Sequence, residues 1–154
     1  MSKVSAGILL YRTIGDLPEF FLVHPGGPFF ARKNEGWWTI PKGEPEEGEA
    51  LQVCALREFK EETGYVPKAP FKELEPIVQK AGKKVYCWAA RGDLDAADIT
   101  CNTFEIEWPR KSGKKKTFPE VDRAGWFIYD DAVKLINDRQ AAFLDEALTF
   151  INSI

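Results

Sequence analysis

The chain has 154 residues and a formal net charge of −3, and 44% of its residues are hydrophobic. This is the balance of one globular domain, which we expect to cover residues 1–154. The acidic balance argues against a basic nucleic-acid-binding face, so no stable nucleic-acid complex is expected.

The chain shows no run long and apolar enough to span a membrane, and its N-terminus lacks the apolar core of a signal peptide. Its three cysteines are widely spaced, without a CxxC pair. A reducing cytoplasmic location is therefore predicted.

The first segments predict a β-hairpin. Lys3–Tyr11 contains the apolar run Ala6–Leu10, which is typical of a strand buried on both faces. Glu19–His24 is predicted as a second strand, and the glycine, aspartate and proline between the two segments are turn residues. His24 is either a hydrogen-bonded residue at a strand end or a ligand or general base.

The next segment, Pro25–Gly36, is predicted to be a long loop. It is rich in glycine and proline and carries Phe29 and Phe30. Long loops in compact domains are often functional. These aromatic side chains either line the rim of a substrate pocket and stack on a base, or plug the core.

Trp37–Pro41 predicts a short strand that leads into Lys42 and Gly43. Gly43 tolerates a backbone conformation that can bring its carbonyl to a metal ion. Lys42 is either a point charge that binds a phosphate oxygen or a surface lysine.

Gly43–Tyr65 is dense in glutamate and predicts a helix. Gly48 and Glu49 mark its start, with an acidic residue in the first turn, and Gly64 is placed as a C-cap glycine.

Three glutamates of this helix, Glu58, Glu61 and Glu62, fall within about 100° of arc at roughly 100° per residue. The repulsion among them is best relieved by a divalent cation, because hard cations take carboxylate oxygens as ligands. Arg57 lies one turn before Glu61, so an ion pair can orient that carboxylate. The alternative is a solvated acidic helix.

The order and spacing of this segment are similar to the signature of the Nudix hydrolases at every defined position. The matching residues are Gly43, Glu49, Arg57, Glu58, Phe59, Glu61, Glu62, Gly64 and Tyr65. The resemblance implies an Mg²⁺-dependent enzyme, with Mn²⁺ as a substitute, that cleaves a diphosphate linkage in a nucleoside diphosphate linked to another moiety. The substrate is a small phosphoanhydride, and we expect a monomer or a homodimer.

The resemblance also implies roles for individual residues. The implied metal ligands are Gly43, Glu58, Glu61, Glu62 and Glu120. The implied catalytic groups are Arg57, Glu58, Glu61 and Glu120. Glu120 is included because several Nudix enzymes carry a further glutamate about six residues before a strand tryptophan, here Trp126. The general base is Glu58, Glu120 or a metal-held water. The alternative for Glu120 is a surface acid, and Glu105 or Glu107 is then the next candidate for its role in the site.

The second half of the chain alternates strands and turns. Phe71–Gln79 and Lys84–Ala90 predict strands joined at a hairpin turn. Gly92–Thr100 predicts a turn or short helix, and Thr103–Trp108 predicts a strand with one exposed face. Pro109–Thr117 is a basic loop, either a solvated hairpin tip or an electrostatic lip that attracts polyphosphate.

The C-terminal segments are predicted as the strand Ala124–Tyr129, a short helix over Asp130–Ile136 and a last helix over Gln140–Ile151 with Asp138 as N-cap. Strands on both sides of the acidic helix predict an α/β fold. The resemblance implies the Nudix-type three-layer α/β/α sandwich with a mixed β-sheet.

The tripeptide Pro41-Lys42-Gly43 resembles the dinucleoside polyphosphate and diphosphoinositol polyphosphate branches of the family. We therefore favour a dinucleoside polyphosphate as substrate, with Lys42, Phe29 and Phe30 as substrate-binding residues. Inositol pyrophosphates, nucleotide sugars and nucleoside triphosphates remain alternatives. A non-catalytic nucleotide-binding sensor module is the alternative from another class.

Overall fold

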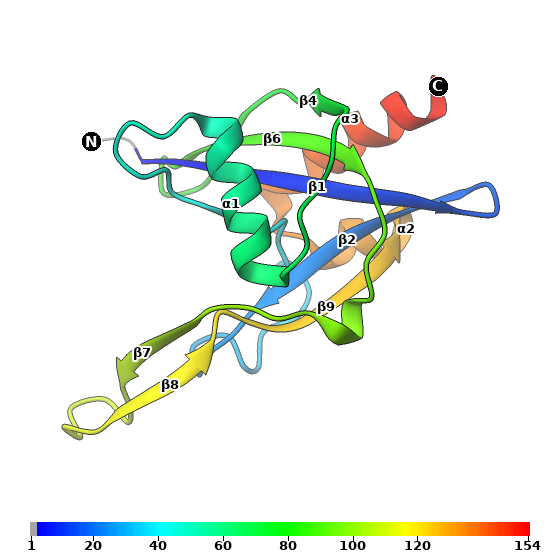
Figure 1. Cartoon of the computed structure of the whole chain (residues 1–154). Coiled ribbons are helices and arrows are strands. Elements are labelled where there is room, and N and C mark those ends of the chain that lie inside the picture. Colours follow the sequence, from blue (N-terminus) through cyan, green and yellow to red (C-terminus); the bar gives the residue numbers. More distant parts are fainter. Residues whose placement is uncertain (1–2) are drawn as a thin grey trace.

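The computed structural model describes residues 3–154, which form a seven-stranded mixed sheet, a separate two-stranded sheet and helices on both faces of the main sheet (Figure 1). The main sheet contains β1 (Val4–Ile14), β2 (Leu17–Pro25), β3 (Lys42–Gly43), β4 (Phe71–Glu73), β5 (Ile77–Val78), β6 (Lys84–Arg91) and β9 (Val121–Ile128). The two-stranded sheet pairs β7 (Thr103–Glu107) with β8 (Lys115–Pro119). The α-helices are α1 (Leu51–Thr63), α2 (Tyr129–Leu135) and α3 (Ala141–Asn152).

The central strands run in the order β4-β6-β1-β2-β9, with β3 added to β1 and β5 to β6. β1 and β6 are parallel, whereas the other neighbouring strands of this sheet are antiparallel. The hairpin predicted at the N-terminus is thus confirmed as β1 and β2.

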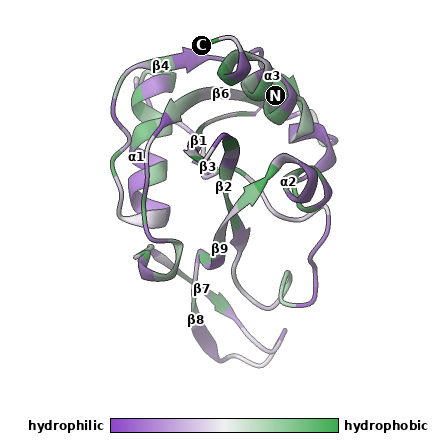
Figure 2. Cartoon of the chain, turned by 90° about the vertical axis from the view of Figure 1, so that its right-hand side faces the viewer, coloured by the Kyte–Doolittle hydropathy of each residue, from purple (hydrophilic) through white to green (hydrophobic). Residues whose placement is uncertain are grey.

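Both faces of β1 are buried, as its continuous apolar run predicts. Ile8 and Leu10 pack into a core beneath α1 that includes Phe59, while Leu9 packs into a second core beneath α2 and α3 that includes Phe143. Figure 2 shows α1 on one side of the strands and α2 and α3 on the other. The predicted α/β/α sandwich is confirmed.

The helix that carries the glutamates begins later than predicted. Glu49 N–H donates to the Glu46 carbonyl in a turn with Gly48 at φ 75°, and Ala50 is extended, so α1 starts at Leu51. Glu49 therefore precedes the helix, and the first turn of α1 contains no acidic residue. The predicted C-cap is confirmed, because Gly64 is left-handed at φ 84° and its N–H donates to the Lys60 carbonyl.

The N-terminus of the last helix also differs from the prediction. The side chain that accepts a backbone N–H is that of Asn137, from Arg139, and not that of Asp138. A 3₁₀ turn over Asp138–Gln140 follows, so the α-helix starts at Ala141.

One predicted strand and one predicted loop also differ from the structure. Trp38 and Thr39 each form a single bridge, and the strand before the helix is Lys42–Gly43. The basic segment is not a loop throughout, because Lys115–Pro119 pairs with Thr103–Glu107. No helix within residues 3–154 is long and apolar enough to cross a membrane.

Candidate active site

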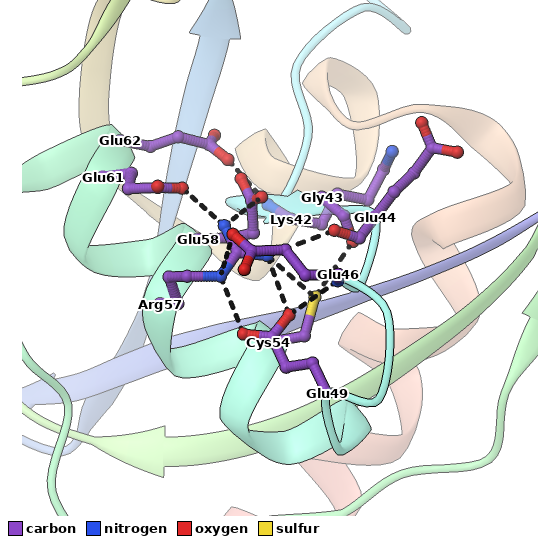
Figure 3. Close-up of polar contacts among 10 residues, drawn as sticks. All are labelled: Lys42, Gly43, Glu44, Glu46, Glu49, Cys54, Arg57, Glu58, Glu61 and Glu62. Carbon is purple, nitrogen blue, oxygen red and sulfur yellow. Dashed lines mark hydrogen bonds and ion pairs between the residues drawn. The ribbon is translucent and has the colours of Figure 1, made fainter.

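Arg57, in the middle of α1, is the centre of a network of carboxylates (Figure 3). Its Nε and Nη2 donate to the two Glu49 carboxylate oxygens at 2.8 and 2.9 Å, and its Nη1 donates to Glu58 at 3.0 Å and Glu61 at 2.8 Å. This fork geometry is available to arginine and not to lysine. The predicted pair with Glu61 is present, whereas sequence reasoning missed the contact with Glu49.

Glu49 acts as the anchor of this network. It also accepts the backbone N–H of Glu46, so its carboxylate fixes both the turn and the guanidinium. The hydrogen bonds from Arg57 hold the pKa of Glu49 at about 2, well below its usual range. The position was visible in the sequence as the first glutamate of the motif, but its distance of eight residues from Arg57 gives no helical contact.

The Glu58 carboxylate lies directly against the backbone of Gly43. A Cβ atom at position 43 would overlap that carboxylate, so the absence of a side chain here makes room for it. The Gly43 carbonyl accepts a hydrogen bond from the Cys54 thiol at 3.4 Å. Gly43 therefore contacts α1 at two points, through the Glu58 carboxylate and through the Cys54 thiol.

A cleft of about 320 Å³ opens beside these residues. It is lined by Val23, Pro25, Thr39, Ile40, Lys42, Glu58, Glu62, Glu120 and Val121. Its volume falls within the range of small-molecule sites. The structure thus brings Lys42, Glu58, Glu62 and Glu120 together, although Glu120 is 58 residues from Glu62 in the sequence.

The backbone around Glu120 explains how it reaches α1. Asn102 N–H donates to the Glu61 carbonyl at 2.9 Å, and Glu120 N–H donates to the Asn102 carbonyl at 3.0 Å. Gly26 N–H donates to the Glu120 carbonyl at 2.9 Å, and a Cβ atom on Gly26 would overlap the Pro119 carbonyl. These bonds tie the end of β8 to the helix and to the loop after β2.

The carboxylates in and around the cleft repel one another. Burial, followed by repulsion from Glu58, raises the pKa of Glu62 well above its usual range, and Glu62 is 8% exposed. Burial and repulsion from Glu61 also raise the pKa of Glu58 and of Glu120. Burial lowers the pKa of Lys42, whose backbone N–H donates to Glu62 at 3.2 Å.

This donor set fits Mg²⁺. Within residues 3–154, no three His, Cys, Asp or Glu side chains converge as a ready-made metal cage. Mg²⁺ does not require one, because it keeps several waters and usually binds one or two carboxylates together with substrate phosphates. The oxygen donors and uncompensated negative charge of the cleft match those needs.

The predicted aromatic residues lie outside this cleft. Phe29 packs edge-on against Trp108 with ring centres 5.5 Å apart, and Phe30 packs against Trp37 at 5.8 Å. His24 is fully buried, with its ring nitrogens 2.7 Å from an Asp122 carboxylate oxygen and 2.7 Å from the Lys33 carbonyl. Its contacts are those of a hydrogen-bonded residue at a strand end.

A family model described as the NUDIX domain matches residues 1–147. The chain belongs to the Nudix family. Its fold resembles a crystal structure of a binary complex of an Ap4A hydrolase from Caenorhabditis elegans, with a TM-score of 0.70 and 25% identity over 97% of this chain and 99% of the other.

Two curated viral relatives share shorter regions with this Nudix chain. An mRNA-decapping protein of African swine fever virus is 63% identical over 27 residues, 18% of this chain and 11% of the relative. A candidate mRNA-decapping protein of Acanthamoeba polyphaga mimivirus is 33% identical over 110 residues, 64% of this chain and 26% of the relative. This chain thus spans about a quarter or less of either relative. Together with the family match, the comparisons support the predicted pyrophosphohydrolase.

Proposed function

We propose that the protein is an Mg²⁺-dependent pyrophosphohydrolase that cleaves the polyphosphate bridge of a dinucleoside polyphosphate. The observation that carries this proposal is the single cleft lined by Lys42, Glu58, Glu62 and Glu120. A single lysine beside carboxylates that repel one another is an arrangement suited to a metal ion and a polyanionic substrate.

Glu58, Glu62 and Glu120 would hold the metal, with the Gly43 carbonyl and Glu61 as further donors. When bound, Mg²⁺ offsets phosphoryl charge and lowers the pKa of a coordinated water. Arg57 holds Glu58 and Glu61 in defined orientations, and Lys42 offsets charge on the bridging phosphates. Glu58 or Glu120 would accept the proton of the attacking water, because both carboxylates line the cleft.

A neighbouring cavity of about 670 Å³ supports a nucleoside-containing substrate. It shares Val121 with the carboxylate cleft and is lined in part by Trp38, Arg123 and Phe127. The Arg123 guanidinium lies 5.3 Å from the centre of the Trp38 ring. Apolar and planar groups beside a phosphate site are suited to a base and ribose. The Ap4A hydrolase named among the similar structures supports the same substrate class.

The test is product formation from diadenosine tetraphosphate, separated by ion-exchange chromatography, with Mg²⁺, with Mn²⁺ and with chelator. We expect turnover with either metal and none with chelator. Glu120→Gln is expected to slow turnover by about 10²-fold, the scale of positioned catalytic groups, with little change in KM. A higher kcat/KM for a nucleotide sugar or an inositol pyrophosphate would replace the proposed substrate, and tight nucleotide binding without turnover would indicate a sensor.

A further inference from the structure

The hairpin of β7 and β8, residues 103–119, is called the arm here. It extends away from the main sheet (Figure 1). It contains five lysine and arginine residues and two glutamates, although the whole chain carries a net charge of −3. The arm is therefore a basic projection on an acidic protein.

One face of the arm combines aromatic and basic side chains. Phe104 pairs with Phe118 and Ile106 with Lys116, while Trp108 N–H donates to the Lys114 carbonyl. Side chains of directly paired residues lie on the same face of a sheet. Alternation along each strand then places on one face Phe104, Ile106, Trp108, Lys114, Lys116 and Phe118. The four large apolar side chains in this row are half-buried. Trp108 packs against Phe29 and Phe104 lies against Gly27, so the loop after β2 covers part of the row and leaves part of it accessible.

Among the described residues, the glutamates of the arm leave four of its five basic residues without an ion pair. Glu107 accepts the backbone N–H groups of Lys111 and Gly113 at 3.0 and 3.2 Å and so holds the tip turn. Glu105 lies 3.8 Å from Lys115 in an exposed pair. In the part of the chain that the structure describes, no ion pair is formed by the exposed residues Arg110, Lys111, Lys114 and Lys116.

The position of these charges selects the kind of ligand. The arm ends at Pro119, and the next residue, Glu120, lines the carboxylate cleft. At about 3.3 Å per residue, Lys115 lies roughly 17 Å along the strand from Glu120. The tip cannot contact phosphates held in the cleft. A single strand of nucleic acid, at about 3.4 Å per nucleotide, covers that distance in about five nucleotides.

We propose that the arm is a binding surface for single-stranded RNA, which it guides to the carboxylate cleft. Its exposed cations bind the phosphate backbone, and its aromatic row stacks unpaired bases, the combination used by proteins that bind single strands. The RNA is a substrate when its 5′ end carries a phosphoanhydride linkage, and this part rests on the proposed function. Two of the relatives are named as decapping or candidate decapping proteins, which supports RNA as the strand.

The binding test uses the full chain in chelator, so that it is independent of turnover. The probe is a 12-nucleotide single-stranded RNA with a 5′ hydroxyl and a 3′ fluorescein, followed by fluorescence anisotropy from 0.05 to 0.5 M salt. The arm variant neutralises four charges: Arg110→Gln, Lys111→Gln, Lys114→Gln and Lys116→Gln. The control variant neutralises one arginine and three lysines that are exposed elsewhere: Lys68→Gln, Lys80→Gln, Lys134→Gln and Arg139→Gln.

We expect the arm variant to bind on the order of 10²-fold more weakly at 0.1 M salt and to lose about 3 from the slope of log affinity against log salt. The control variant keeps the affinity and slope of the wild type. Phe118→Leu keeps the apolar packing but removes a stacking ring, and should weaken binding by about 10-fold with an unchanged slope. Absence of binding by the wild type, or equal losses in the arm and control variants, would overturn the proposal. An unchanged affinity in Phe118→Leu would remove stacking from it.

Turnover then separates this inference from the proposed function. The arm variant should have a lower kcat/KM for the same RNA carrying a 5′-5′ triphosphate-linked guanosine, and an unchanged kcat/KM for diadenosine tetraphosphate. Equal effects on the two substrates would overturn guidance of RNA to the cleft. If the arm variant loses RNA binding in chelator while the wild type cleaves neither substrate, the arm assignment stands and the proposed function fails.

Discussion

The glutamate-bearing helix α1 and the basic arm carry opposite charges, and they are held in place in very different ways. On α1, Phe59 is fully buried and Arg57 fixes carboxylates on several sides. The arm contacts the body through Phe29 against Trp108 and through Phe104, whose ring would lie 2.7 Å from a Cβ atom on Gly27.

The two regions therefore use their charges in different ways. Partly buried carboxylates interact strongly with one another and with a bound cation, because little water screens them. Exposed lysines interact weakly with any single partner and depend on salt. We therefore expect α1 to act by holding a few carboxylates in fixed positions. The arm is expected to act through the sum of several weak contacts.

The largest expected effect is on turnover in Glu62→Gln. The amide keeps the acceptor for the Lys42 N–H but removes the charge from the cleft. We expect kcat for diadenosine tetraphosphate to fall by at least about 10²-fold. Glu47→Gln, at an exposed glutamate outside the cleft, is the control and should leave kcat unchanged. Near-normal activity of both Glu61→Gln and Glu62→Gln at limiting Mg²⁺ would contradict the metal site.

A smaller effect is expected from Lys42→Gln. Loss of a charge-assisted contact to phosphate should raise KM for a tetraphosphate substrate by about 10-fold. The rise should be smaller for a substrate with a single diphosphate, which carries less charge. The control is Lys80→Gln, at an exposed lysine outside the cleft. Equal rises in KM for the two substrates would indicate that Lys42 is not a phosphate ligand.

Phe29→Ala discriminates between two roles of the aromatic loop. If Phe29 anchors the arm, loss of its contact with Trp108 should weaken RNA binding by about 2- to 10-fold, the range of an aromatic pair. KM for diadenosine tetraphosphate should then be unchanged. A higher KM for this small substrate, with unchanged RNA binding, would favour stacking of Phe29 on a substrate base.

The smallest effect is on metal-free stability. Because the pKa of Glu62 is raised in the folded state, the folded protein binds more protons than the unfolded chain, and stability falls as pH rises above about 4. Metal-free Glu62→Gln should therefore unfold at a Tm about 2–4 °C above that of the wild type at pH 8, the shift produced by about 1 kcal/mol in a domain of this size. The difference should shrink toward pH 4. A Tm gap that is constant across this pH range, measured by calorimetry, would contradict a cost due to charge.

Local patterns in the sequence were enough to predict the first hairpin, α1 with its C-cap, and the ion pair of Arg57 with Glu61. Each depends on residues a few positions apart, where helix or strand periodicity determines which side chains meet. The placement of Glu120 near α1 was predicted only through the family resemblance, since no local spacing connects it to the helix. The start of α1 was misplaced because a single glycine turn precedes it.

Contacts between distant segments became known only from the tertiary structure. It turned Glu49 back onto Arg57, joined Glu120 to α1 through Asn102, and placed Phe29 against Trp108 instead of in the carboxylate cleft. The basic segment Pro109–Thr117 was already visible in the sequence, but the pairing of β7 with β8 that makes it part of a projecting arm was not. Composition sums charge over all residues, and periodicity reports only near neighbours. Long-range contacts depend instead on strand register and backbone hydrogen bonds that form only when the whole sheet is assembled.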